Sequence, residues 1–216
     1  MKSVLQLAPE PIAEEVYRAV DHAEVISSLF RDFAVALPKD SVVRRDEPLS
    51  NRTTLRVGGP ADLWVEPSSE NALSSVLELC ALRRVPWMVL GRGSNLLVRD
   101  GGFRGVVISL ASPHFSRLEF NGDRIEAGAG VRLKQLATES RRQQLAGLEF
   151  LEGIPGSLGG ALRMNAGAMG SWTFDVVERL RCMSPKGQVL DLPVSEVQVV
   201  YRSCPILQTH LALGAT

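Results

Sequence analysis

The chain has 216 residues, with 24 Lys and Arg, 24 Asp and Glu, and a formal net charge of zero. This length suits one large domain or two small ones. The balanced charge gives no sign of the basic face that nucleic-acid-binding proteins carry. No apolar run reaches the length of a membrane-spanning helix. We therefore expect neither nucleic acid nor a membrane among the partners.

The N-terminus and the cysteines indicate the cellular compartment. Residues 1–10 contain one Lys and an apolar stretch too short for a signal peptide. The three cysteines (Cys80, Cys182 and Cys204) lie far apart and form no CxxC pair, which disfavours a disulfide framework and a zinc site. These features predict a reducing, cytoplasmic location and no bound metal.

The first half of the chain predicts alternating helices and strands. Residues 12–35 carry apolar side chains at helical spacing, and residues 38–54 are polar and predict a connector. A strand over 61–66, a helix over 70–84 and a buried strand over 86–90 follow. This strand–helix–strand order favours parallel pairing.

A loop containing two glycines, Gly91-Arg-Gly-Ser-Asn-Leu-Leu-Val98, continues from the last of these strands. Backbone N–H groups in such a turn can form a concavity that holds an anion. The loop lacks the third glycine of the dinucleotide-binding fingerprint, and residues 96–98 predict a strand instead of the helix that the fingerprint needs. The sequence leaves two interpretations open: a phosphate site that is not of the Rossmann type, or an ordinary turn between strands.

The second half predicts more antiparallel structure. Asn121-Gly122-Asp123 separates two alternating segments and is a strong hairpin signal. The remaining predictions are a strand over 105–110, a helix over 131–146 ended by Gly147, a second hairpin formed by 176–183 and 188–192, and strand-like segments over 197–202 and 206–212. We expect one α/β lobe over about residues 55–110 and another over about 111–216, with a cofactor held by both.

The segment over residues 149–168 is rich in glycine but also carries apolar residues. Glycine weakens helices and strands and lets the backbone approach a neighbour closely. The segment therefore predicts buried, irregular backbone with Ser157 able to cap a following helix. Its neighbour could be a flat cofactor or simply another element of the fold, and the segment alone does not distinguish the two.

Several motifs occur in an order that resembles the UDP-N-acetylenolpyruvoylglucosamine reductase family. They are Thr54-Leu-Arg-Val-Gly-Gly-Pro-Ala61, Gly91-Arg-Gly-Ser-Asn-Leu-Leu-Val98, Gly147-Leu-Glu-Phe150, Gly153-Ile-Pro-Gly-Ser-Leu-Gly-Gly-Ala161, Met164-Asn-Ala-Gly-Ala168 and Tyr201-Arg-Ser203. The resemblance covers about residues 50–216. It implies an α+β fold, the two-lobed FAD-binding module of the vanillyl-alcohol-oxidase type, divided into an N-terminal helix and connector (1–50), lobe 1 (51–110) and lobe 2 (111–216).

The resemblance also implies an activity and a set of site residues. NADPH would reduce non-covalent FAD, and a hydride would then pass to the enolpyruvyl ether of a UDP-sugar, giving UDP-N-acetylmuramate. The loop over 91–96 would hold the FAD pyrophosphate, and the later segments would line the flavin. The implied cofactor-binding residues are Gly91, Arg92, Gly93, Ser94, Asn95, Leu96, Gly153, Ile154, Pro155, Gly156, Ser157, Gly160, Asn165 and Gly167.

Arg202 matches the active-site arginine of the family. A guanidinium can bind the carboxylate of the enolpyruvyl group and stabilise negative charge that develops there. The family pattern continues into a third, C-terminal substrate domain with a serine general acid and a glutamate, and we expect neither in this chain. Cys204 also stands where a serine is usual, and Met169 where an aromatic residue is common.

Two alternatives to the reductase stay open, and the second of them follows from the expected lack of the serine and the glutamate. One is an FAD-dependent oxidase of the same fold, which the lack of a histidine in the glycine loops disfavours, since some such oxidases link flavin to histidine. The other is a flavin-binding fragment without catalysis.

Overall fold

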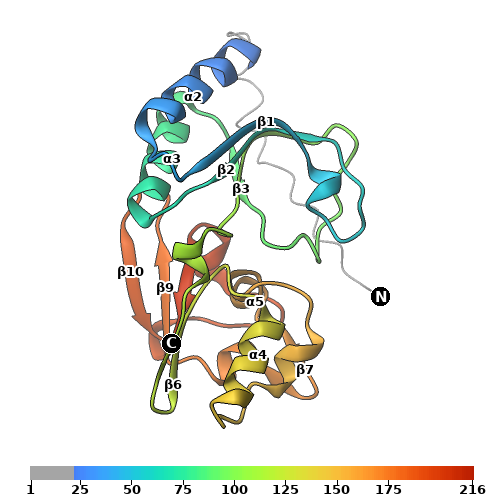
Figure 1. The fold of residues 1–216 in the computed structure, drawn as a ribbon, viewed down its shortest axis with the longest axis vertical. Helices are drawn as coiled ribbons and strands as arrows, with labels where there is room; N and C mark the ends of the chain where they lie inside the picture. Colours follow the sequence, from blue (N-terminus) through green and yellow to red (C-terminus); the bar gives the residue numbers. More distant parts are fainter. Residues whose placement is uncertain (1–21) are drawn as a thin grey trace. The chain divides into compact units, whose positions relative to one another are not determined.

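The computed structural model describes residues 22–216, which divide into two compact units between Ser109 and Leu110. We call them unit 1 and unit 2. Over these residues no helix combines the length and apolar character that crossing a bilayer requires. Figure 1 colours the chain from its N-terminus to its C-terminus.

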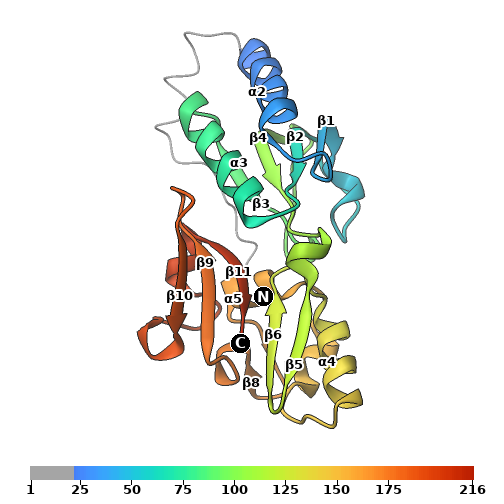
Figure 2. The same cartoon turned by 60° about the vertical axis from the view of Figure 1, so that its left-hand side comes forward.

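Over residues 22–109, unit 1 contains a four-stranded sheet, two α-helices and the short 3-10 helix η2 (Leu49–Asn51). Its elements are α2 (His22–Ala36), β1 (Val42–Pro48), β2 (Pro60–Glu66), α3 (Glu70–Arg83), β3 (Trp87–Val89) and β4 (Phe103–Ile108). The sheet order is β1-β2-β4-β3, with β1 antiparallel to β2 and the other neighbours parallel. The helices α2 and α3 lie side by side next to this sheet in Figures 1 and 2.

The helices and parallel strands of unit 1 largely follow the prediction. The end of α2 and the span of α3 are confirmed, and Ser69 caps α3 by accepting the Ala72 N–H. Residues 12–21 of the first predicted helix lie outside the described residues. The parallel direction of β2 and β3 is confirmed, but β4 lies between them and pairs with both.

Two predictions for unit 1 are wrong. The predicted connector contains β1, an edge strand whose central residues are exposed and charged, so it lacks the apolar alternation that marks a half-buried strand. Residues 96–98, predicted as a strand, belong to an irregular loop. This loop is fixed by backbone hydrogen bonds: the N–H groups of Gly59 and Gly102 both donate to the Arg99 carbonyl at 2.9 Å.

Unit 2 contains a five-stranded antiparallel sheet in the order β10-β9-β11-β6-β5. Its strands are β5 (Leu118–Asn121), β6 (Arg124–Gly128), β7 (Gly167–Ala168), β8 (Ser171–Trp172), β9 (Arg179–Met183), β10 (Val189–Pro193) and β11 (Leu211–Ala215), of which β7 and β8 form a separate small ribbon. Its α-helices are α4 (Leu133–Arg142) and α5 (Leu158–Met164), and its 3-10 helices are η3 (Pro113–Ser116), η4 (Glu149–Gly153), η5 (Thr173–Asp175), η6 (Val194–Glu196) and η7 (Pro205–Gln208).

Both predicted hairpins of unit 2 are confirmed. The β5–β6 turn places Gly122 at a φ of 60°, where glycine pays no steric penalty. The second hairpin pairs β9 with β10. Figure 2 shows the β5–β6 hairpin as a long projecting ribbon beside α4.

Three predictions for unit 2 need correction. Helix α4 ends at Arg142 and is followed by Gln144 at a φ of 59°, so Gly147, which has a φ of 103°, lies beyond the end of the helix and does not terminate it. Residues 197–202 form no strand, and the last strand is β11. The glycine-rich segment is not irregular throughout, because residues 158–164 form α5. Burial of Leu158, Ala161 and Leu162 in the core of unit 2 outweighs the weak helix propensity of the glycines.

Candidate functional site

The loop over residues 91–96 packs against a preceding turn of unit 1. The Thr54 N–H donates to the Gly93 carbonyl at 3.1 Å. Gly93 is buried at a φ of 61°, and a Cβ placed on it would lie 2.3 Å from the Arg52 carbonyl oxygen. Close packing therefore explains this glycine without a ligand.

The rest of this loop is open to solvent and offers hydrogen-bond donors. Gly91, Arg92 and Asn95 are exposed, while Ser94 and Leu96 are half-buried. Among residues 22–216, the backbone N–H groups of Gly91, Arg92 and Asn95 donate no hydrogen bond to another residue. Such N–H groups can bind an anion, which a phosphate group would supply.

Sequence reasoning missed a polar pocket in the same unit. It has a volume of about 380 Å³ and is lined by Ser50, Asn51, Thr53 and Arg56.

 Hydroxyl, amide and guanidinium groups line the unit 1 pocket. Three of its four lining residues precede the Thr54–Ala61 motif and Arg56 lies within it, so the polar residues of this segment were the available signal.

The glycines of the segment over 149–168 divide into two groups. A Cβ on Gly153 would meet nothing within 4 Å, and one on Gly160 would meet only the Ser157 hydroxyl, at 3.9 Å. These two positions leave room for a ligand. A Cβ on Gly159 would lie 3.0 Å from the Ala129 Cβ, so this glycine serves packing within the protein.

Residues 154–157 connect η4 to α5. Ile154 and Gly156 are half-buried, Pro155 is exposed and Ser157 is buried. Ser157 occupies the N-cap position of α5, but its side chain makes no capping hydrogen bond, so the expected cap is present in position only.

Asn165 ends α5 and links three segments of unit 2. It is buried, with a φ of 37°. Its side-chain oxygen accepts the Phe174 N–H at 3.2 Å, and its Nδ2 lies 3.5 Å from the Val200 carbonyl oxygen. The side chain therefore has a structural role in addition to any contact with a cofactor.

Arg202 lies in a tight turn between Val200 and Ser203. The two end residues exchange backbone hydrogen bonds of 3.0 and 3.1 Å, and Arg202 has a φ of 60°. Its guanidinium carbon lies 5.3 Å from the ring centre of Trp172 and 5.6 Å from that of Tyr201. The side chain is exposed, so its charge is available to an anionic ligand.

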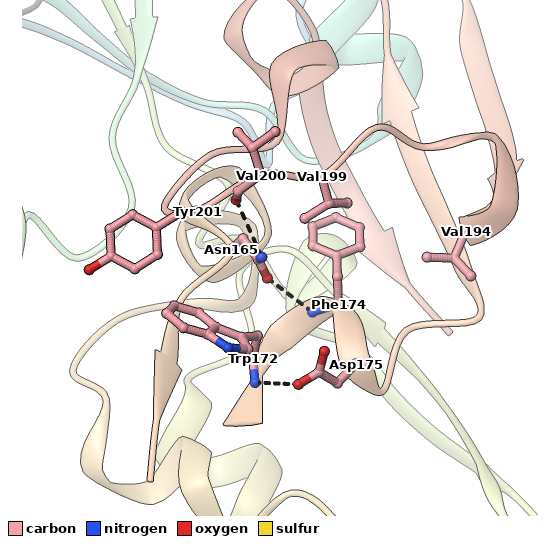
Figure 3. A pocket seen from close by; sticks show the side chains of 8 residues that line it. All are labelled: Asn165, Trp172, Phe174, Asp175, Val194, Val199, Val200 and Tyr201. Carbon is pink, nitrogen blue, oxygen red and sulfur yellow. Dashed lines mark hydrogen bonds between the residues drawn. The ribbon is translucent and has the colours of Figure 1, made fainter. Parts of the chain in front are cut away.

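A pocket of about 540 Å³ lies beside this turn (Figure 3). It is lined by Asn165, Trp172, Phe174, Asp175, Val194, Val199, Val200 and Tyr201. Figure 3 shows the Tyr201 hydroxyl pointing away from the other labelled side chains. Of the predicted site residues, only Asn165 lines this pocket. Gly167 pairs with Trp172 and the Arg202 guanidinium lies near its ring, so both adjoin the lining, whereas Gly153 to Ser157 are not part of it.

Burial changes the pKa of several groups in unit 2. It lowers the pKa of the Arg163 guanidinium, which donates to the Leu207 carbonyl. It raises the pKa of the Cys182 thiol to about 11, and it also raises that of Cys204. Residues 22–216 contain no cluster of three or more side chains suited to holding a metal ion.

The fold and these loops define a class of protein. A family model described as an FAD binding domain matches residues 61–193. The chain belongs to this family of FAD-binding domains.

Curated relatives are more specific. The UDP-N-acetylenolpyruvoylglucosamine reductase of Clostridioides difficile (strain 630) is 42% identical over 174 residues, which are 80% of this chain and 57% of that protein. The reductase of Alkaliphilus metalliredigens is 39% identical over 82% of this chain and 57% of its own length. The resemblance to this reductase family is confirmed, and the chain spans little more than half the length of these relatives.

Solved structures support the same fold. The reductase from Thermus caldophilus has a TM-score of 0.67 and 31% identity, covering 81% of this chain and 60% of that one. A structure of p-cresol methylhydroxylase has a TM-score of 0.61 at 12% identity, covering 89% of this chain and 44% of that one, and shows the fold alone. The predicted α+β fold of the FAD-binding module is confirmed.

Proposed function

We propose that this chain binds FAD and takes part in the NADPH-dependent reduction of UDP-N-acetylglucosamine enolpyruvate to UDP-N-acetylmuramate. The observation that carries the proposal is the 42% identity to a reductase of that name over 80% of the chain. We propose this activity for the chain as part of such a reductase, and we propose the cytoplasm as the location of that reductase.

When bound, FAD would supply the chemistry of hydride transfer between NADPH and the enolpyruvyl double bond. In unit 1, the N–H groups of Gly91, Arg92 and Asn95 would bind the cofactor's phosphates, together with the side chains of Ser94 and Asn95. In unit 2, the open positions at Gly153 and Gly160 would allow the flavin to approach the backbone. The remaining proposed cofactor residues are Gly93, Leu96, Ile154, Pro155, Gly156, Ser157, Asn165 and Gly167.

Arg202 would bind the substrate carboxylate. Negative charge develops beside that carboxylate when hydride adds to the double bond, and a fixed guanidinium stabilises it. Arginine stays protonated at all physiological pH values, so Arg202 would supply charge and hydrogen bonds and would not donate the proton that completes the reduction.

The test is direct. The purified chain should take up FAD and show a flavin absorption spectrum, and the flavin should be released by heat. NADPH oxidation is then followed with and without UDP-N-acetylglucosamine enolpyruvate. A chain that stays colourless after incubation with FAD would contradict the cofactor assignment. Flavin uptake without substrate-dependent NADPH oxidation would contradict the activity but not the cofactor.

A further inference from the structure

Trp172 stands beside Arg202 in unit 2 and takes no part in the proposed chemistry. We propose that Trp172 is a positioning residue, which with Tyr201 holds the Arg202 guanidinium in one orientation. The inference rests on the proposed function only for its consequence in catalysis, because the contact itself is a property of the folded chain.

The Trp172 and Tyr201 rings are arranged edge to face, and the Arg202 guanidinium lies near both. Their centres are 5.4 Å apart and their planes meet at 75°. The Arg202 guanidinium carbon lies within 6 Å of both, at 5.3 and 5.6 Å. A cation over an aromatic face is attracted by the ring quadrupole, most strongly for tryptophan.

The Trp172 ring is itself held in place. The Trp172 backbone pairs with Gly167 in the β7–β8 ribbon, and the Trp172 backbone N–H donates to the Asp175 carboxylate at 2.8 Å. A Cβ on Gly167 would lie 2.5 Å from the Trp172 ring, so only glycine allows the ring to rest on this backbone. Gly167 therefore acts on Arg202 through Trp172.

The turn between Val200 and Ser203 holds the backbone of Arg202, but the orientation of its long side chain depends on contacts with other residues. Arg202 is exposed, and a free arginine side chain samples many rotamers. Contact with two rings restricts those rotamers before a carboxylate binds. The expected gain in kcat/KM is between about twofold and about thirtyfold, the range that corresponds to cation–π contacts.

Nuclear magnetic resonance of the full chain tests the contact without cofactor or substrate. The Arg202 side-chain protons, assigned with Arg202→Lys, should be shifted upfield by ring currents. Trp172→Leu should remove most of this shift, and Trp172→Phe should retain part of it. Met169→Ala, which alters an exposed side chain in the same ribbon, should leave the shift unchanged.

Kinetics of the FAD-loaded chain test the consequence. Trp172→Leu should lower kcat/KM for the enolpyruvyl substrate by between about twofold and about thirtyfold. Trp172→Phe should restore part of this loss and should leave the melting temperature unchanged. Arg202 protons at random-coil positions in the unmodified chain, or unaffected by Trp172→Leu, would overturn the proposal. If the unmodified chain shows the ring-current shift but no turnover, the proposed function fails while the positioning contact stands.

Discussion

Gly93 and Arg52 approach so closely that a Cβ on Gly93 would lie 2.3 Å from the Arg52 carbonyl oxygen. Gly93→Ala should therefore displace the loop over 91–96, weaken FAD binding at least about tenfold and destabilise the fold by about 1–3 kcal/mol. Flavin titration and urea unfolding measure the two effects. Gly101→Ala is the matched control, since its Cβ would meet nothing within 4 Å. Equal effects of the two substitutions would contradict the role of close packing.

Asn165 combines a strained backbone with a buried hydrogen bond. Asn165→Ala should cost about 1–3 kcal/mol, because it leaves the Phe174 N–H without its acceptor. Asn165→Gly loses the same bond but relieves the left-handed backbone, so it should be less destabilising by about 1 kcal/mol. Chemical unfolding of both variants checks the order, and an alanine variant as stable as the glycine variant would show that the backbone at φ 37° carries no strain.

Arg202→Ala should lower kcat by about 10²–10³-fold, the usual effect of removing a group that stabilises developing charge. Stability should change little because the side chain is exposed. Steady-state NADPH oxidation measures the rate. Arg141→Ala removes another exposed arginine of unit 2 and should leave the rate unchanged. A wild-type rate in Arg202→Ala would exclude the proposed role.

The buried thiols predict a loss of stability in alkali. Burial raises the pKa of Cys80 to about 12 and of Cys182 to about 11, from an ordinary value of 9.0. The thiolate is the charged form, so the unfolded chain loses these protons at lower pH than the folded chain. The free energy of unfolding should therefore fall as pH rises above the ordinary value.

Urea unfolding at a series of alkaline pH values measures how steeply the free energy of unfolding falls with pH, and Cys80→Ala should make this fall less steep. A thiol reagent should label the native protein slowly and the denatured protein fully, because all three cysteines are buried. Rapid labelling of the native protein would contradict the burial of these thiols.

Local signals predicted much of the fold. Asn121-Gly122 specified a hairpin and Ser69 specified the start of α3, since each depends on a few adjacent residues. Strand β1 could not be predicted from its own residues, because its formation depends on pairing with β2, which lies further along the chain. The extent of helix α5 was not predicted, although Ser157 was expected to cap a following helix, because burial against the core, which no local propensity reports, stabilises this glycine-containing segment.

The candidate site was predicted by resemblance more than by residue chemistry. Arg202 looks like any surface arginine in the sequence, and its aromatic neighbours become evident only when Trp172, thirty positions earlier, is brought beside it. Gly167 was predicted to face a flavin, and the structure places the Trp172 ring against it. Its contact with a cofactor stays a prediction.

Strand β11 lies at the centre of the unit 2 sheet, between β9 and β6. Each of its neighbours belongs to a hairpin that can form from local contacts alone, but the two hairpins share a sheet only through β11. During synthesis, the ribosome must therefore release residues 211–215 before the sheet of unit 2 can close, and the two hairpins must wait as separate ribbons with unpaired edges until then.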